Sequence, residues 1–176
     1  MNKNLTIDEM KKMKEPTRAF LVKLEDNKPG VRFNGFKLRD CETGEVFHEY
    51  NPSSVTELDY FADHELDYKF STRILKAKTL GSTLKLCVGN QTVKNLVLAE
   101  RHYIDGKLAA NYSFEFPLFI PNSENSVEFI YTLPKFDESV LNKIKKNEPI
   151  FAKSDTFIFV EGKLIIHRRA NYTYWN

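Results

Sequence analysis

The chain has 176 residues, and its 26 Lys and Arg side chains are nearly balanced by 24 Asp and Glu side chains. A chain of this length can bury a core without disulfides or metals, so we expect a single globular domain. Because the opposite charges are interspersed and no long apolar run exists, composition argues against a nucleic-acid surface, an anionic-membrane surface and stable membrane insertion.

Residues 1–28 are read as a polar N-terminal extension that carries one short helix. Thr6 and Glu9 have the spacing of a capping box, in which each side chain accepts a hydrogen bond from the other residue's backbone N–H. The box predicts a helix that begins after Thr6 and runs through Lys14. We therefore assign the remainder, residues 29–176, to one β-sandwich domain.

The rest of the chain consists mainly of short segments in which polar residues alternate with β-branched or aromatic ones. Gly, Pro, Asn and Asp separate the segments, and no helices alternate with them. This pattern predicts an all-β chain folded as a two-sheet antiparallel β-sandwich. The segments are 31–40, 45–50, 68–78, 82–89, 94–103, 107–120, 126–133, 156–160 and 163–175.

The hairpin between the fifth and sixth segments decides which side chains face inward. A plain two-residue turn at Asp105 and Gly106 would bring apolar residues of one strand onto the same face as polar residues of the other. A three-residue loop, with Gly106 as a bulge, pairs Tyr103 with Lys107 and avoids this cost. Under that register one inner surface carries Leu96, Leu98, Tyr112, Phe114 and Phe116.

Glu100 and His102 then lie at the end of this apolar wall, with Glu100 opposite the small Ala110. Polar groups buried against hydrocarbon need partners. They can be solvated or paired with each other, or they can bind an amide or carbonyl attached to an apolar tail, and both interpretations stay open. Pro117 cannot donate to a ladder, so it indicates an edge strand or a bulge.

One insert departs from the strand pattern. In DESVLNKIKKNEP, Val140, Leu141 and Ile144 recur at helical spacing, and Pro149 follows as a stop, which predicts a short surface helix.

No pattern typical of an enzyme or a metal site is found. The four histidines show no HxxxH or HxH spacing, and the chain has no P-loop, no GxSxG and no dinucleotide-binding glycine pattern. The run from Asp63 to Glu65 is read as a solvated connection. Cys41 and Cys87 are widely separated, which favours free thiols and a cytoplasmic location. We therefore expect no catalysis, no metal and no cofactor.

Several stretches resemble the lipid chaperones related to the GMP phosphodiesterase delta subunit, and most closely the uncoordinated-119 branch. They are GFKLRDCETGEVFHEY, TLKLCVGNQTVKNLVLAERHYIDGKL, FEFPLFIPNSEN, SVEFIYTLP and SDTFIFVEGKLIIHRRANYTY. The resemblance implies an immunoglobulin-like sandwich that takes the N-terminal myristoyl group of cargo proteins between its sheets. It also implies release by a GTP-bound ADP-ribosylation-factor-like GTPase, and transport toward a cilium or flagellum. We expect the protein to be a monomer.

The resemblance also implies roles for individual residues. Tyr68 matches a tyrosine that hydrogen-bonds the lipidated end of the cargo, and Glu100 and His102 match polar residues at the pocket. Ile74 and Ile158 replace aromatic residues of relatives, which alters the expected pocket width. The other expected lining residues are Phe36, Tyr112, Phe114, Phe116, Tyr131 and Tyr172.

Three alternatives remain open at this point. The altered width leaves room for a chaperone of prenylated cargo. The sandwich could instead have a filled core and bind only other proteins. A carrier of free fatty acids is the third alternative.

Overall fold

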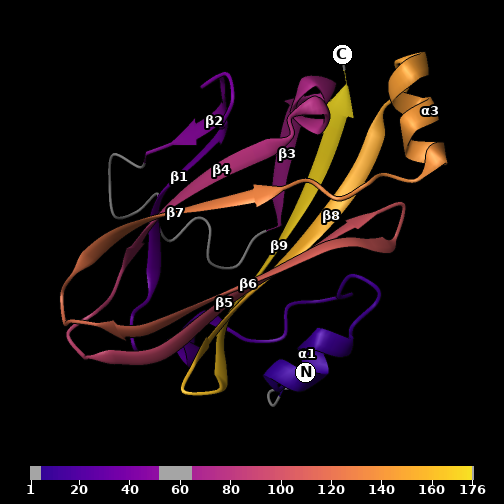
Figure 1. Cartoon of the computed structure of the whole chain (residues 1–176). Helices are drawn as coiled ribbons and strands as arrows, with labels where there is room; N and C mark the ends of the chain where they lie inside the picture. Colours follow the sequence, from indigo (N-terminus) through magenta and orange to yellow (C-terminus); the bar gives the residue numbers. More distant parts are fainter. Residues whose placement is uncertain (1–4, 52–64, 176) are drawn as a thin grey trace.

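The computed structural model describes residues 5–51 and 65–175, which contain nine strands in two facing sheets (Figure 1). The strands are β1 (Arg32–Asp40), β2 (Val46–Tyr50), β3 (Leu66–Ser71), β4 (Thr79–Cys87), β5 (Val93–Ile104), β6 (Lys107–Phe119), β7 (Glu124–Thr132), β8 (Ile150–Val160) and β9 (Lys163–Trp175). The four-stranded sheet has the order β2-β1-β4-β7, and the five-stranded sheet has the order β3-β9-β8-β5-β6. The predicted all-β sandwich is confirmed, and each predicted segment contributes one strand.

One strand pair departs from the expected antiparallel pattern. β3 runs parallel to β9, with Tyr68 beside Tyr172. A parallel pair needs a long connection, and residues 72–162 separate β3 from β9 in the chain. β3 also ends earlier than predicted, because Ser71 caps a 3-10 turn, η2 (Thr72–Lys76), by accepting a hydrogen bond from the Arg73 N–H.

Both predicted helices are present, and the first is shorter than predicted. Helix α1 (Ile7–Lys12) begins after Thr6 with both halves of the Thr6–Glu9 capping box, and it ends two residues before the predicted Lys14. Helix α3 (Glu138–Lys146) follows β7 and ends at Asn147, which adopts the left-handed conformation at φ 57°. A further 3-10 turn, η1, spans Leu24–Asp26.

In the β5–β6 hairpin the expected side chains face inward, but the predicted three-residue loop is wrong. Asp105 and Gly106 form a two-residue turn with φ of 48° and 77°, and Ile104 pairs with Lys107. Asp-Gly favours such turns because their twist matches that of the paired strands. The extra residue is Ala109, which bulges within β6, so the register shifts inside the strand instead of in the turn.

The bulge changes the residues opposite the polar pair. Glu100 lies opposite Tyr112 instead of Ala110, and Ala110 lies opposite His102. The inward facing of all four residues is nevertheless as predicted. β6 is the edge strand of its sheet, which agrees with the position of Pro117.

The outer face of the five-stranded sheet is covered as well. Leu5, Met10 and Val22 of the N-terminal segment pack against Phe157 and Phe159 of β8, which have no exposed surface, and against residues of β5 and β9. The extension that precedes β1 is therefore part of the packed structure.

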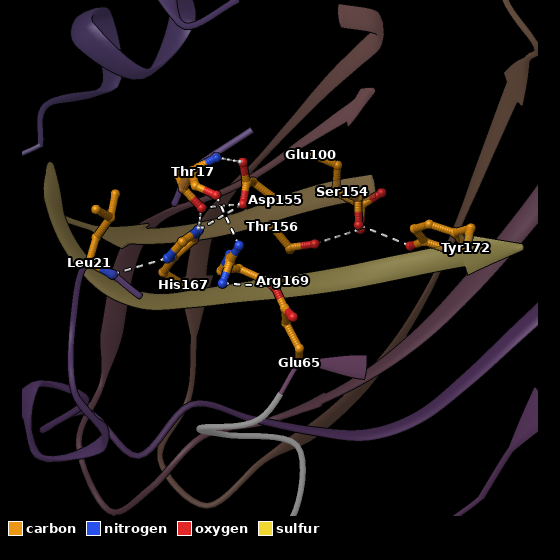
Figure 2. A network of polar contacts seen from close by, with 10 residues as sticks. All are labelled: Thr17, Leu21, Glu65, Glu100, Ser154, Asp155, Thr156, His167, Arg169 and Tyr172. Carbon is orange, nitrogen blue, oxygen red and sulfur yellow. Dashed lines mark hydrogen bonds and ion pairs between the residues drawn. The ribbon is translucent and has the colours of Figure 1, made fainter. Parts of the chain in front are cut away.

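A buried polar network fixes residues 13–21, here called the N-terminal strap, to this outer face (Figure 2). The Asp155 carboxylate accepts hydrogen bonds from the Thr17 N–H at 2.8 Å and the Thr17 hydroxyl at 2.6 Å. His167 Nδ1 accepts from the Leu21 N–H at 3.1 Å, so its proton lies on Nε2, which is 3.1 Å from Asp155 Oδ1. Arg169 donates to the Thr17 carbonyl at 3.0 Å.

The network also tunes the carboxyl group at its centre. Burial by itself would raise the pKa of Asp155, but hydrogen bonds from His167 and Thr17 outweigh it and hold the pKa below its usual value.

Asp63 and His64 of the predicted polar connection fall outside the described residues, whereas Glu65 forms an ion pair with Arg169 at 2.7 Å. None of the helices described in residues 5–51 and 65–175 is long and apolar enough to cross a membrane.

Candidate functional site

Two neighbouring cavities are lined by residues of both sheets. The first, here called the aromatic cavity, has a volume of about 100 Å³. The second, here called the polar cavity, has a volume of about 230 Å³. They are adjacent, because Phe36, Tyr68, Glu100 and Tyr172 contribute to both linings.

The aromatic cavity is built from strands of both sheets. Tyr68 of β3 stacks on Tyr172 of β9 with ring centroids 5.4 Å apart, and Tyr112 of β6 meets Tyr131 of β7 at 4.5 Å. The His102 ring lies 5.9 Å from the Tyr112 ring. Between these rings the wall is aliphatic, with Leu38, Ile74, Leu75, Leu80, Ile104 and Leu133.

Glu100 and His102 form the polar part of this wall. Glu100 Oε2 lies 3.3 Å from His102 Nε2, and each side chain is 29% exposed. On the neighbouring strand β8, the Thr156 hydroxyl lies 3.5 Å from Glu100 Oε1, and the Ser154 hydroxyl lies 3.0 Å from the Tyr172 hydroxyl of β9 (Figure 2). The pairing of Glu100 with His102 is thus present, and both still border the cavities. A paired carboxylate keeps lone pairs that can accept a further hydrogen bond.

The phenols around the cavity remain neutral. Burial raises the pKa of each of these hydroxyls above its usual value, and the negative charge of Glu100 adds to the shift. The affected residues are Tyr68, Tyr112, Tyr131 and Tyr172. Each therefore keeps its hydroxyl proton at neutral pH, and Tyr112 donates its proton to the Thr132 carbonyl at 3.3 Å.

The polar cavity contains a partly buried cation. Burial lowers the pKa of Arg168 to about 10, which still leaves it charged at neutral pH. Its guanidinium lies 4.0 Å above the Phe33 ring, within reach of a cation–π contact. Burial also lowers the pKa of His48, which lines the same cavity.

The residues expected at the site from the sequence divide into two groups. Eight of them line the cavities: Phe36, Tyr68, Ile74, Glu100, His102, Tyr112, Tyr131 and Tyr172. The other three, Phe114, Phe116 and Ile158, line neither cavity; Ile158 belongs to the core cluster between the sheets, and the two phenylalanines are partly buried and pack against it. Ile158 has no exposed surface, and Phe114 stacks on Phe129 with ring centroids 3.8 Å apart.

Sequence reasoning missed Ser154 and Arg168, which line the polar cavity. β8 begins six residues before the predicted start at Thr156. The prediction started too late because the polar run Lys153 to Asp155 interrupts the apolar pattern. Continuing the alternation backward from Ile158 through Thr156 would have placed Ser154 on the inner face. Arg168 pairs with Thr156 and shares that face.

The arrangement suits a ligand with an apolar tail and a polar head. Apolar cavities with a few convergent polar groups are typical of small-ligand sites. The aliphatic and aromatic walls can enclose the tail, while the carboxylate, imidazole and phenols can hydrogen-bond an amide or carbonyl. Across residues 5–51 and 65–175, no group of three or more potential metal ligands comes together.

Nearly the whole chain is similar in sequence to known proteins. Residues 25–174 match the family model described as GMP-PDE, delta subunit. The chain is 36% identical over 184 residues to protein unc-119 homolog B of Danio rerio, covering 99% of the chain and 75% of the relative. It is 36% identical over 169 residues to the Homo sapiens homolog B, covering 90% and 67%. It is 34% identical over 163 residues to protein unc-119 of Caenorhabditis elegans, covering 90% and 74%.

Proposed function

The chain belongs to the GMP-PDE delta-subunit family and to its unc-119 branch, and from this premise we propose that it is a lipid-binding chaperone for proteins with an N-terminal myristoyl group. The observation that carries the proposal is the pairing of Glu100 with His102 in an otherwise apolar wall between the sheets. A myristoyl glycine has the matching chemistry, a long hydrocarbon tail ending in an amide.

The hydrocarbon tail supplies most of the affinity. Enclosing about a dozen methylenes, at roughly 0.8 kcal/mol each, gives a gross gain on the order of 10 kcal/mol before the entropy of binding is subtracted. A single myristoyl chain holds a protein on a membrane only marginally. A cavity of this kind can therefore compete with a bilayer for singly acylated cargo.

The polar residues supply selectivity. Tyr68, Glu100 and His102 would hydrogen-bond the amide and the first residues of the cargo, because a ligand that leaves buried polar groups unpaired is penalised. Discrimination among cargo proteins would then depend on the residues that directly follow the lipidated glycine.

Release needs a second partner, which we propose to be a GTP-bound ADP-ribosylation-factor-like GTPase. Such an effector shifts the equilibrium only if it binds the emptied form better than the loaded form. In this proposal the chaperone collects cargo in the cytoplasm and delivers it where the active GTPase is found, as in a cilium or flagellum.

The decisive experiment titrates the protein against one fluorescent peptide in three forms: N-myristoylated, farnesylated at its other end, and unmodified. We expect tight binding of the myristoylated form alone. Preference for the farnesylated form would assign the chain to prenylated cargo. A lack of binding by every form would favour a protein-interaction module. A myristic acid arm separates a carrier of free fatty acids, which should bind the free carboxylate at least as well.

Replacing Glu100 or Tyr68 with alanine is expected to weaken binding of the myristoylated peptide by roughly tenfold, since each change removes a hydrogen-bonding group worth about 1–1.5 kcal/mol. Fluorescence anisotropy measures the affinity, and circular dichroism shows whether the fold is kept. Glu115→Ala is the matched control, because Glu115 is an exposed residue of β6. Unchanged affinity in a folded variant would remove that residue from the site.

A further inference from the structure

Arg169 lies between the N-terminal strap and the start of strand β3 (Figure 2). One terminal nitrogen of its guanidinium donates to the Thr17 carbonyl at 3.0 Å, and the other lies 2.7 Å from Glu65 Oε1. The guanidinium carbon lies 5.7 Å from the centre of the Phe20 ring, which also belongs to the strap. Arg169 therefore joins the strap to the residue that directly precedes β3.

β3 is a short edge strand whose two ends are held differently. It has six residues, and within the described residues it pairs with β9 alone. Near its end, Phe70 is 6% exposed and packs in a core cluster. Near its start, Leu66 is only partly buried, and Asp67 is exposed. Apolar packing thus secures the end of the strand, whereas the start depends more on polar contacts.

Two residues of β9 supply these polar contacts. Asn171 donates to Asp67 at 3.0 Å and lies 3.5 Å from Glu65. The Arg169–Glu65 ion pair adds a charged contact, with 15% of the Arg169 side chain and 36% of the Glu65 side chain exposed. Solvent ions screen such a partly buried pair less than an exposed one. Because the bond to the strap already fixes the guanidinium, pairing also costs less side-chain entropy.

The strand that Arg169 holds carries Tyr68. Tyr68 borders both cavities, and its ring stacks on Tyr172 at 5.4 Å and meets the His48 ring edge-on at 5.3 Å. Because Tyr68 follows Glu65 by three residues, a movement of the start of β3 would shift this ring away from both contacts. A ligand that needs Tyr68 in place binds only the fraction of molecules in which it is there.

We propose that Arg169 is a positioning residue for the lipid site: by pairing with Glu65 it holds β3, and thereby Tyr68, in the conformation that accepts the cargo. Arg169 also contributes to the lining of the polar cavity, so the test has to separate this indirect role from contact with the ligand. Glu65 lines neither cavity, which makes the separation possible. The inference rests on the proposed function and adds to it a residue that acts through β3.

The test combines affinity for the myristoylated peptide with amide hydrogen exchange of the unliganded protein. Glu65→Gln and Arg169→Gln are each expected to weaken binding by roughly threefold or more, because loss of the pair lowers the fraction of molecules with Tyr68 in place. Exchange of the backbone amides of residues 66–71 should become faster by at least the same factor. Amides at the centre of β5 and β8 should keep the wild-type rate.

A double-mutant cycle distinguishes the indirect role from contact with the ligand. If Arg169 acts through Glu65, adding Arg169→Gln to Glu65→Gln should weaken binding further by less than about twofold. A contact between Arg169 and the ligand would persist in Glu65→Gln, and the two effects would then multiply. Arg169→Lys should restore slow exchange only in part, since an ammonium can pair with Glu65 but lacks the planar fork that also reaches Thr17.

Arg73→Gln is the matched control. Arg73 pairs with Glu45 at 2.8 Å, and neither residue lines the two cavities. The variant removes the same charge from an ion pair of similar length. It should leave both the affinity and the exchange of residues 66–71 unchanged.

The outcomes are distinct. Wild-type affinity in Glu65→Gln, or independent effects in the double variant, would overturn the positioning role and leave the proposed function in place. A wild-type protein that binds no acylated peptide would refute the proposed function, and the role of Arg169 in cargo binding with it. The exchange measurement needs no ligand, so it decides independently whether Arg169 holds β3.

Discussion

Replacing Asp155 with alanine is expected to lower the free energy of unfolding by about 3–5 kcal/mol, as is typical when one partner of a buried polar pair is removed. The Asp155 side chain is 1% exposed. Alanine would leave the Thr17 N–H and the His167 Nε2–H buried without the carboxylate that accepts from them. Urea unfolding followed by circular dichroism measures the loss, and faster proteolysis within residues 13–21 would show that the N-terminal strap has loosened.

A suitable control is Asp67→Ala. Asp67 is exposed on β3 and accepts one hydrogen bond from Asn171 at 3.0 Å, and surface changes of this kind usually shift stability by no more than about 0.5 kcal/mol. If both variants lost equal stability, the strap network would not be the source of the effect.

The Asp155 carboxyl group should also make the free energy of unfolding depend on pH in the acidic range. The pKa of Asp155 is lower in the folded protein than in the unfolded chain, so its contribution is complete above the unfolded pKa of about 3.9 and is lost as pH falls through the folded pKa. The groups that face it are Thr17, His167 and the more distant Tyr103. In Asp155→Asn this titration is absent. The gap in unfolding free energy between the wild type and Asp155→Asn should therefore narrow as the pH is lowered through this range.

Replacing Ala110 with tryptophan is expected to weaken binding of a myristoylated peptide by about a hundredfold or more. Ala110 lines the aromatic cavity beside Tyr112 and opposite His102. An indole there would occupy the space of the tail, and excluding about four methylenes removes roughly 3 kcal/mol of burial. Because the ring fills a void, we expect the unfolding midpoint to stay at or above that of the wild type.

Ser113→Trp provides the comparison, since Ser113 is exposed on the same strand and points away from the cavities. It adds the same ring and should leave affinity unchanged. Equal affinity for Ala110→Trp and the wild type would mean that the acyl chain binds elsewhere.

Local pattern predicted a large part of this site. Alternation, together with the hairpin register that keeps apolar residues on one side, placed Tyr112, Phe114 and Phe116 on the same face as Leu96 and Leu98. Glu100 and His102 were placed inward by the same rule, and both line the aromatic cavity. The rule could not locate the bulge, since a bulge in the turn and one at Ala109 give the same facing.

The resemblance to a family added residues that alternation could not select, notably Tyr68 and Tyr172. These two come from strands that pair in parallel, and no short-range signal predicts such a pair. Two apolar residues on the outer face of β5, Val97 and Ala99, were the available sign that a second layer covers this sheet. A strand buried on both faces carries apolar residues without strict alternation.

By itself the amino-acid sequence determined the strands, both helices and the inward set of side chains, because these follow from spacings of two to four residues. Only the tertiary structure decided which inward residues border a cavity, since Tyr112 and Phe114 have the same facing, yet Tyr112 lines the aromatic cavity whereas Phe114 stacks on Phe129 and lines neither cavity. It also decided the strap network, which joins Thr17 to residues 138 and 150 positions away. Contacts at such separations result from packing of the whole chain, and no local pattern encodes them.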